Sequence, residues 1–417
     1  MKNFIWVFLG LVFIAGCADV TTAGLKTVRA SFANDDFIES AGKFANDAEI
    51  KNQNNLQLLI TGLSQFQAKN YHTSDNAFEE FNKRNIDTIG GSTLREAKTL
   101  IGGQLSAEYK PSMMDSLFVS YYQIWDAIGE SRKNDVRVII NQSYARQQDM
   151  SRAYADLVQK NQEKLTDSNT ELISTLKDQN SKWAAYTDIM NPALMYLSGI
   201  WFLNSGDYQD AQTYLARANG MSQNNSFVET DLELAEQNKK PQGTTWVFIE
   251  SGFAPILKQE SLSFPVPTGN GVIMASIAVA EPVFWKGNQT VSGAQQLADV
   301  NAMFMTEFNE YRVNDALRAW TSASARAVAQ AAAYNSKSQF SGLLGLGSTI
   351  YSLATTNAEV RSWVTLPENI SVLRLKTSDL IANNISDIIG SDIPKSGNYL
   401  IYVRLTENKP IVHIFKI

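Results

Sequence analysis

The stretch NPALMYLSGIWFLNSGDYQDAQTYLARAN, residues Asn191–Asn219, decides the fold of the N-terminal half. It opens with Asn-Pro, which is typical of a helix start, because asparagine caps free amides and proline lacks the amide hydrogen that the first turn leaves unbonded. Gly206 then separates two apolar runs that both have helical periodicity. Small residues occur where two helices must nearly touch, and large apolar residues occur beside them. The stretch therefore predicts a helical hairpin.

The spacing of these residues resembles that of a tetratricopeptide repeat. The residues that carry the resemblance, and that we expect to pack the two helices together, are Gly199, Gly206, Tyr208, Ala211, Leu215 and Ala218. The resemblance implies helix pairs that stack on their neighbours and bind other polypeptides in the groove that the stack forms. It favours a scaffold over an enzyme.

An earlier stretch, Asn55–Arg84, repeats this spacing less faithfully. The matching positions hold Gly62, Tyr71, Phe78 and Phe81. Lys69 and Ser74 occupy the positions of Gly206 and Ala211, so the match is partial. The stretch predicts either a second repeat or a generic helical hairpin.

Helical periodicity also covers the region between these two stretches. Met113–Gly129 and Asp135–Gln148 predict another hairpin, and residues 150–190 predict one long amphipathic helix or two shorter ones. Residues 32–240 are therefore expected to form a helical domain that is similar to a tetratricopeptide array.

The N-terminus has the pattern of a lipoprotein leader. Lys2 precedes an apolar run that is too short to span a membrane comfortably, so residues 1–16 predict a signal peptide. The following Ile14-Ala15-Gly16-Cys17 resembles a bacterial lipobox, in which the cysteine thiol receives a diacylglycerol. Cys17 is the only cysteine of the chain, so an internal disulfide is excluded and we expect lipidation there. The alternative is a buried apolar cysteine in an ordinary signal peptide or anchor helix.

Acyl chains on Cys17 would hold the protein on a membrane. In the sorting pattern of such lipoproteins, aspartate directly after the cysteine favours the inner membrane. Here that position is Ala18, and Asp19 comes one residue later. We therefore expect an outer-membrane protein that faces the periplasm, with the small, polar and poorly periodic residues 17–31 as its tether.

A domain boundary is predicted at Lys239–Gly243, where helical periodicity gives way to short β-branched and aromatic runs. The runs with strand composition are Thr244–Glu250, Leu257–Phe264, Gly271–Ala280, Ser371–Thr377, Tyr399–Thr406 and Pro410–Lys416. A helical pattern at Asp299–Asn335 separates the early runs from the late ones, and the last two runs predict a hairpin. Residues 241–417 are therefore expected to form an α+β domain in which the late strands complete an antiparallel sheet, and the fold class of the whole chain is α+β.

Several motifs resemble those of an uncharacterised family of bacterial outer-membrane lipoproteins with a tetratricopeptide-like N-terminal half. The residues that carry this resemblance are MYLSG at Met195–Gly199, GDYQDA at Gly206–Ala211, WVFIESGFAP at Trp246–Pro255 and RSWVTLPENISVLRL at Arg361–Leu375. The resemblance implies no known reaction and no cofactor. It suggests a connection with cell-wall synthesis.

Charge and motif content argue against nucleic-acid binding and against catalysis. The formal net charge is -6, whereas a surface that binds phosphates is usually basic. His72 and His413 are the only histidines, and neither has a serine, carboxylate or metal ligand near it in a known spacing. We interpret both as structural. No nucleophile elbow, zinc-protease motif or Walker loop occurs, so we expect no enzymatic activity, no cofactor and no metal.

Candidate partner contacts fall in both halves of the chain. Polar residues on the first helices of the hairpins are expected to line the groove, and Gln65, Tyr196 and Asn204 are the candidates there. Arg361 and Trp363 are candidate anchors, because arginine and tryptophan often contribute most to binding. The alternative is that Trp363 covers a sheet edge while Arg361 pairs locally.

Two functions of different classes follow from these observations. The first is a lipid-anchored periplasmic adaptor that binds other envelope proteins through the helical array and performs no catalysis. The alternative is an envelope hydrolase directed at peptidoglycan, or a regulator of one, that uses carboxylates of the C-terminal domain.

Overall fold

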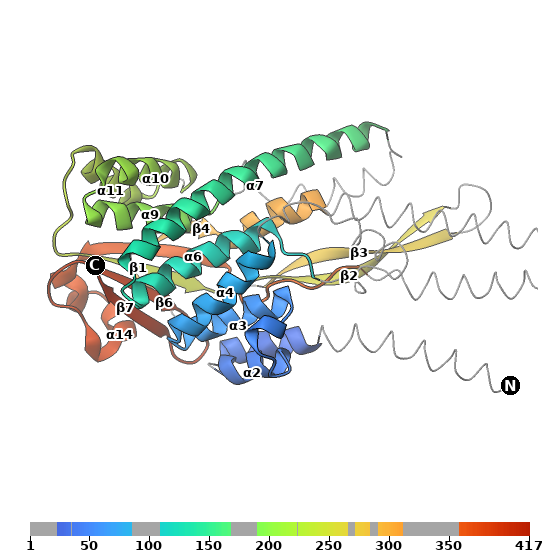
Figure 1. The fold of residues 1–417 in the computed structure, drawn as a ribbon, viewed down its shortest axis with the longest axis horizontal. Helices are drawn as coiled ribbons and strands as arrows, with labels where there is room; N and C mark the ends of the chain where they lie inside the picture. The colour runs from blue at the N-terminus through green and yellow to red at the C-terminus, as the bar shows by residue number, and fades with distance from the viewer. Residues whose placement is uncertain are drawn as a thin grey trace, which may run out of the picture.

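The computed structural model describes residues 23–34, 36–85, 109–167, 190–222, 224–265, 272–283, 291–311 and 358–417. Within them the fold is α+β, as predicted: helices fill most of the N-terminal half, and a five-stranded sheet comes from the C-terminal half (Figure 1). The predicted signal peptide and Cys17 lie outside the described residues. So does most of the helix expected at Asp299–Asn335, of which residues 300–311 are described as helical.

In the described chain the helices pair as three successive hairpins. The first helices are α3 (Asn55–Gln67), α6 (Met113–Gly129) and α9 (Pro192–Ser205); the second helices are α4 (Tyr71–Asn85), α7 (Lys133–Asp167) and α10 (Tyr208–Met221). Before them come α2 (Phe37–Phe44) and η1 (Ile50–Asn52), and α11 (Ser226–Glu236) follows them. The separate helices expected at Asp135–Gln148 and from residue 150 onward are one continuous helix, α7, because no glycine or proline interrupts residues 133–167.

The hairpin of α9 and α10 has the close approach that its sequence predicts. Asn191 caps α9 by accepting hydrogen bonds from the amides of Ala193 and Leu194, and Gly206 ends it with a left-handed φ of 84°. A Cβ atom at Gly199 would lie 2.6 Å from Cγ of Leu215, so only glycine fits there. The packing residues Ala211, Leu215 and Ala218 are fully buried, and Tyr208 packs at the edge of the same core.

The hairpin of α3 and α4 has the same kind of contact. A Cβ atom at Gly62 would collide with the ring of Phe78, and Phe78 and Phe81 are both fully buried. Helix α3 begins with a capping box in which Asn54 and Gln57 exchange hydrogen bonds of 3.0 and 2.9 Å. The partial match in sequence therefore corresponds to a hairpin with a similar glycine contact.

The five-stranded sheet has the order β4-β5-β1-β6-β7. Its strands are β1 (Thr244–Ser251), β4 (Gln295–Asp299), β5 (Asn369–Lys376), β6 (Tyr399–Arg404) and β7 (Ile411–Lys416). The predicted terminal hairpin is present as the antiparallel pair β6 and β7. The expectation of an antiparallel sheet is wrong for one pair, because β1 and β6 are parallel. The chain leaves β5 through η3 (Thr377–Ala382) and α14 (Ile385–Ile389) and returns on the other side of β1.

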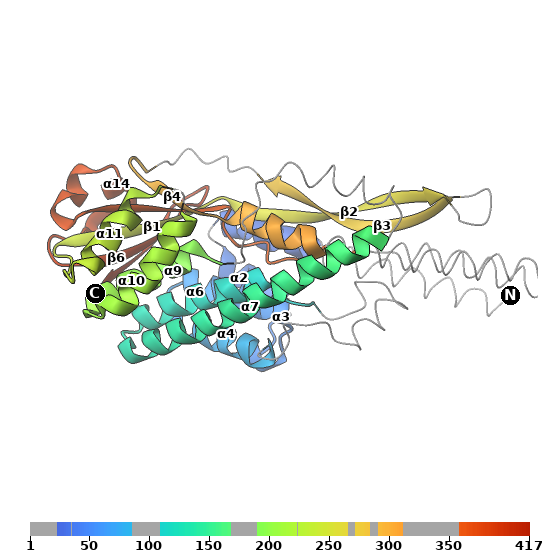
Figure 2. The same cartoon turned by 90° about the horizontal axis from the view of Figure 1, so that it is seen from above.

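Two early strands lie outside this sheet. β2 (Phe253–Pro265) and β3 (Val272–Val283) pair only with each other as a long antiparallel ribbon. The ribbon diverges from the five-stranded sheet at Gly252, whose φ of 67° turns the chain after β1. A register shift follows between Phe253 and Ile256. Figures 1 and 2 show the ribbon and the distal half of α7 projecting from the same end of the molecule.

One continuous apolar core joins the helical array to the sheet. Residues from the first helices and residues from β1, β6 and β7 belong to the same buried cluster. Rings from the two parts touch in pairs: Phe66 with Tyr402, Trp125 with Phe248, and Tyr196 with Phe248, at centroid distances of 4.9, 5.3 and 5.8 Å. A second cluster, on the opposite face of the sheet, is covered by η3 and α14.

The predicted tether is partly structured. Residues 23–33 are helical, and Leu25 and Val28 are buried in the main core. Residues 17–31 show no clear helical periodicity, although Leu25 and Val28 place an apolar residue on each of two successive turns. Among the described residues, no helix is both long enough and apolar enough to cross a membrane.

Candidate functional site: a polar cleft between α4 and α7

The face of the array that was expected to bind a partner is filled by the protein's own sheet. Tyr122 of α6 donates hydrogen bonds of 3.1 Å to both carboxylate oxygens of Glu250 on β1. The same carboxylate accepts 2.7 Å from Tyr402 and 3.1 Å from Nη1 of Arg404. All four side chains are buried.

The geometry of this cluster indicates a structural role. Burial raises the pKa of the Glu250 carboxyl, while Arg404 and the two phenols act in the opposite direction. The second Nη of Arg404 donates 2.8 Å to the carbonyl of Gly252, and Nε2 of Gln67 donates 2.6 Å to Tyr402. Because Glu250 has no contact with solvent, it cannot meet a substrate.

A second buried carboxylate joins α11 to the sheet. Asp231 accepts hydrogen bonds from Tyr196 at 2.7 Å, from Nε1 of Trp246 at 2.6 Å and from Nε of Arg374 at 2.8 Å. Its pKa is raised by burial, against the effect of Arg374. Donors from α9, β1 and β5 thus meet at one residue of α11, which fixes the end of the array on the sheet.

The predicted groove contacts are therefore engaged within the chain. Tyr196 is fully buried on Asp231, and Asn204 is buried with its Oδ1 2.8 Å from Nδ2 of Asn398. Gln65 is half-buried and accepts 2.9 Å from Asn70. The expectation that they line an open groove is wrong for Tyr196, because the sheet occupies the space in which a partner would lie. Asn204 is buried beside Asn398 but also lines a second cavity.

The predicted anchors are also internal. Trp363 is buried and packs against the rings of Phe78 and Tyr122. The guanidinium of Arg361 pairs with Glu359 two residues before it. The arrangement matches the alternative of local pairing, although Trp363 covers the helical array and not the edge of the sheet.

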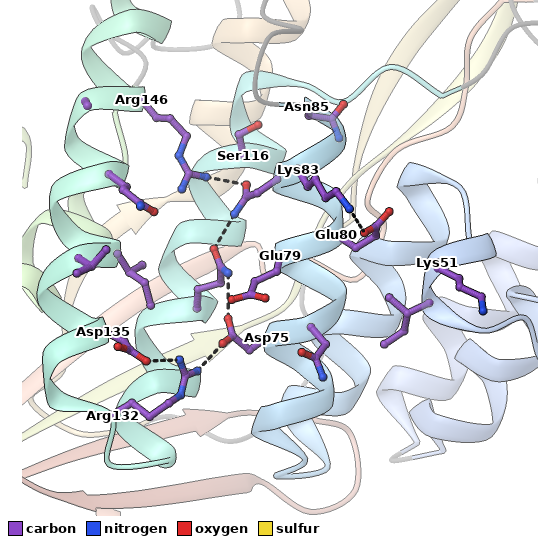
Figure 3. A pocket seen from close by; sticks show the side chains of 18 of the residues that line it. Lys51, Asp75, Glu79, Glu80, Lys83, Asn85, Ser116, Arg132, Asp135 and Arg146 are labelled. Carbon is purple, nitrogen blue, oxygen red and sulfur yellow. Dashed lines mark hydrogen bonds and ion pairs between the residues drawn. The ribbon is translucent and has the colours of Figure 1, made fainter.

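A large cleft remains on the outer side of the array, between α4 and α7. Its volume is about 1220 Å³. Figure 3 shows α4 and α7 as its walls, and Ser116 and Gln123 of α6 line its base. A volume of this size exceeds the usual range of small-molecule pockets, roughly 300 to 1,000 Å³. The cleft has room for a chain segment.

A chain of hydrogen bonds crosses the base of the cleft from one wall to the other (Figure 3). Nη1 of Arg146 donates 2.6 Å to Asn82, Asn82 donates 2.7 Å to Gln123, and Gln123 donates 2.9 Å to Asp75. Arg132 donates to the other oxygen of Asp75 and, at 2.8 Å, to Asp135. The donor and the acceptor of every hydrogen bond are fixed, because the series ends at the carboxylate of Asp75, which can only accept.

The two ends of this series of hydrogen bonds differ in charge. At one end, Arg132 is surrounded by the carboxylates of Asp75, Glu130 and Asp135, so acidic groups are in excess. Glu79 lies on the wall nearby with no hydrogen bond or ion pair to any described residue. Partial burial raises its pKa, with Asp75 as a further cause.

At the other end stands Arg146. Burial lowers the pKa of its guanidinium, and no described carboxylate forms an ion pair with it. Its one described hydrogen bond goes to the neutral amide of Asn82. The cleft therefore has a cation without a counter-ion at one end and a carboxylate without a partner toward the other.

A signal for this cleft exists in the sequence but is hard to distinguish from an ordinary solvated helix face. The lining residues Asp75, Glu79 and Asn82 are spaced by four and three positions on α4. On α7 the corresponding stripe is Asp135, Ile139, Gln142, Arg146 and Met150. Helical spacing shows that each stripe is one face, and only packing shows that the two faces meet.

Neither histidine belongs to the series of hydrogen bonds across the cleft. His413 is buried, with Nδ1 3.0 Å from the hydroxyl of Tyr71, and burial lowers its pKa to about 3. His72 is exposed on α4 with Nδ1 3.6 Å from Glu130. No group of metal-binding residues occurs in the part of the chain that the structure describes.

No protein-family model, no curated protein and no solved structure matches the chain.

Proposed function

We propose that this protein is an adaptor that binds a polypeptide segment of a partner in the cleft between α4 and α7. The observation that carries the proposal is the pair of opposite charges on the cleft walls, Arg146 and Glu79, neither of which forms an ion pair with a described residue. Leaving a largely desolvated guanidinium without an anion is unfavourable. A ligand that supplies the anion would offset this cost.

The spacing of the charges indicates the kind of segment that fits. Arg146 lies eleven residues after Asp135 on the same helix, which corresponds to about 16 Å along the axis. An extended peptide covers that length with about five residues. The segment would place a carboxylate on Arg146 and a lysine, arginine or amine near Glu79 and Asp135. Its backbone would exchange hydrogen bonds with the amides on the walls.

The cleft supports binding better than hydrolysis. A carboxylate pair that hydrolyses a glycosidic bond needs two groups that can reach the substrate. Glu79 is exposed, but both oxygens of Asp75 are already bonded, to Gln123 and to Arg132. In the described part of the C-terminal domain, Glu250 is buried under Tyr122, Tyr402 and Arg404. The hydrolase therefore stays the second candidate.

Membrane attachment is part of the proposal. The lipobox at Cys17 and the resemblance to outer-membrane lipoproteins support an anchored protein that faces the periplasm. Replacement of Cys17 by serine should abolish labelling with a radioactive fatty acid and release or misprocess the protein. Continued acyl labelling of Cys17→Ser would contradict the lipobox.

A cross-linker placed in the cleft tests the binding function. Val138 is 52% exposed and lines the cleft, so Val138→Cys accepts a thiol-reactive photocross-linker there. Ile381→Cys is the control, because Ile381 is 63% exposed and lies in η3, outside the cleft. In native membranes we expect one adduct from position 138 that position 381 does not give.

Two results would contradict the proposal. One is the same set of adducts from both positions, which indicates random encounters. The other is an adduct from position 138 that persists in Arg146→Gln, because the charge would then not contribute. Cleavage of purified cell wall by the full chain would instead favour the hydrolase.

A further inference from the structure

A second cavity lies where the turns of two hairpins meet the end of β7. Its volume is about 590 Å³, within the usual range for small ligands. Ser131 and Lys133 contribute from the turn between α6 and α7, and Ser205 and Asp207 from the turn between α9 and α10. Lys416 and Ile417 close the third side. Figure 1 shows the C-terminus beside the start of α7.

The charged groups of this cavity are mostly cationic. Lys133 comes from α7, Lys240 from the link between α11 and β1, and Lys416 from β7. None of the three forms an ion pair with a described residue. Arg137 also lines the cavity, but it pairs with Asp207 at 2.8 Å and with Asp210 at 3.1 Å. Three exposed lysines that form no ion pair with a described residue therefore line one cavity of a protein whose formal net charge is -6.

Other features of the wall favour an anion of more than one charge. Helix α7 begins at Lys133, so the positive end of its dipole adds to the lysines. Ile417 lines the cavity too. The Arg137–Asp207 ion pair is neutral as a whole, so the three lysines leave the side chains that line the cavity with a positive excess. Lysine is a compact point charge that suits phosphate oxygens, whereas a planar carboxylate prefers the arginine fork.

We propose that this cavity binds a phosphate monoester or diphosphate group held by Lys133, Lys240 and Lys416. The side chains of Ile128, Trp201 and Phe202 form an apolar wall beside the lysines. This wall would accommodate the organic part of the ligand. The chemistry is shared by free phosphate compounds and by phosphorylated headgroups of lipids. The site lies apart from the α4–α7 cleft and does not depend on the function proposed for that cleft.

Calorimetric titration of the full chain in detergent micelles tests the site with two probes. Inorganic pyrophosphate represents a free phosphate compound, and glycerol 3-phosphate represents a lipid headgroup. We expect saturable binding of at least one probe, weakened by added salt because the contacts are ionic. The probe with the higher affinity identifies the source of the phosphate.

Variants connect the binding to the three lysines. The triple variant Lys133→Ala, Lys240→Ala, Lys416→Ala should lower the affinity by about a hundredfold, and each single variant by several-fold, since a charge-assisted bond contributes roughly tenfold or less. All three positions are exposed, so folding should survive, and a thermal melt confirms it. Lys43→Ala is the control, because Lys43 is exposed on α2 and lines neither cavity.

Two results would overturn the assignment. The first is the absence of binding of both probes to the native chain. The second is equal affinity of the triple variant and the Lys43→Ala control, which would assign any measured heat to general charge attraction.

Discussion

Gln67 at the end of α3 donates a hydrogen bond of 2.6 Å to the hydroxyl of Tyr402 on β6, although 335 positions separate the two residues in the chain. Tyr402 in turn donates a hydrogen bond of 2.7 Å to Glu250. The helical array and the sheet are therefore joined by polar contacts inside a shared apolar core. This shared core explains why the side of the first helices that faces the sheet is unavailable to a partner.

Glu250→Gln should destabilise the protein strongly. The substitution keeps the shape of the side chain but leaves Arg404 as a buried cation without its carboxylate, and breaking such a pair costs roughly 3 to 5 kcal/mol. Urea denaturation measures the effect. Glu39→Gln on α2, an exposed carboxylate, is the control and should change the free energy of unfolding little. Equal stability of the two variants would show that the cluster is dispensable.

Gly199→Val should destabilise the hairpin of α9 and α10. The new side chain would collide with Leu215, and overpacking of a close contact costs roughly 1 to 3 kcal/mol. Gly220→Ala in α10 is the matched control, because no atom lies within 4 Å of the added methyl group and alanine favours the helix. Thermal denaturation should show a lower melting temperature for Gly199→Val and no decrease for Gly220→Ala.

The contact between residues 300–311 and α6 should make stability depend on pH. Glu307 accepts hydrogen bonds from the amides of Met113 and Met114 at 2.6 and 2.9 Å, and burial raises its pKa to about 7. The folded state therefore holds the proton more tightly than the unfolded state, for which the ordinary value of 4.5 applies. Stability from this group is present below that value and is lost as pH rises toward about 7.

Denaturation near about pH 5 and near about pH 8 measures this effect. Relative to Glu307→Gln, the native chain should gain free energy of unfolding at the lower pH, because glutamine is neutral at both. Asp115, whose pKa is raised to about 6 by burial, acts in the same direction, and His413, whose pKa is lowered to about 3, acts in the opposite direction, but both are present in the two chains. An identical change with pH in the native chain and in the variant would contradict the assignment.

Arg146→Gln should reduce the capture of a partner in the cleft. Glutamine can keep the hydrogen bond to Asn82 but cannot pair with a carboxylate, so affinity should fall by about tenfold. Arg152→Gln is the control on the same helix, since Arg152 is exposed and paired with Asp149. The yield of the adduct at Val138→Cys in the two backgrounds is the measurement. Equal yields would mean that Arg146 only joins α4 to α7.

Local patterns in the sequence predicted the secondary structure well where a short-range rule applies. Asn191, Pro192 and Gly206 set the ends of α9, and the spacing of Gly199 and Leu215 follows from the contact of adjacent helices. The terminal hairpin follows from two β-branched runs joined by a short polar connection. These features depend on residues close together in the chain.

Other features were not predictable in this way. The parallel pairing of β1 with β6, the separate ribbon of β2 and β3, and the helix at residues 23–33 all depend on contacts between distant segments. The candidate groove residues Tyr196 and Asn204 were assigned to a surface because helical periodicity shows a face and not what covers it. Here the covering element begins at residue 244.

The sequence alone determined that this chain is a set of helical hairpins followed by strands, because caps, glycine contacts and periodicity act over a few residues. Only the tertiary structure decided which surfaces are free. The sheet fills the inner face of the array because its apolar side and the first helices bury each other. The outer face keeps Arg146 and Glu79, which form no ion pair with a described residue, in a cleft formed when α4 and α7 come together.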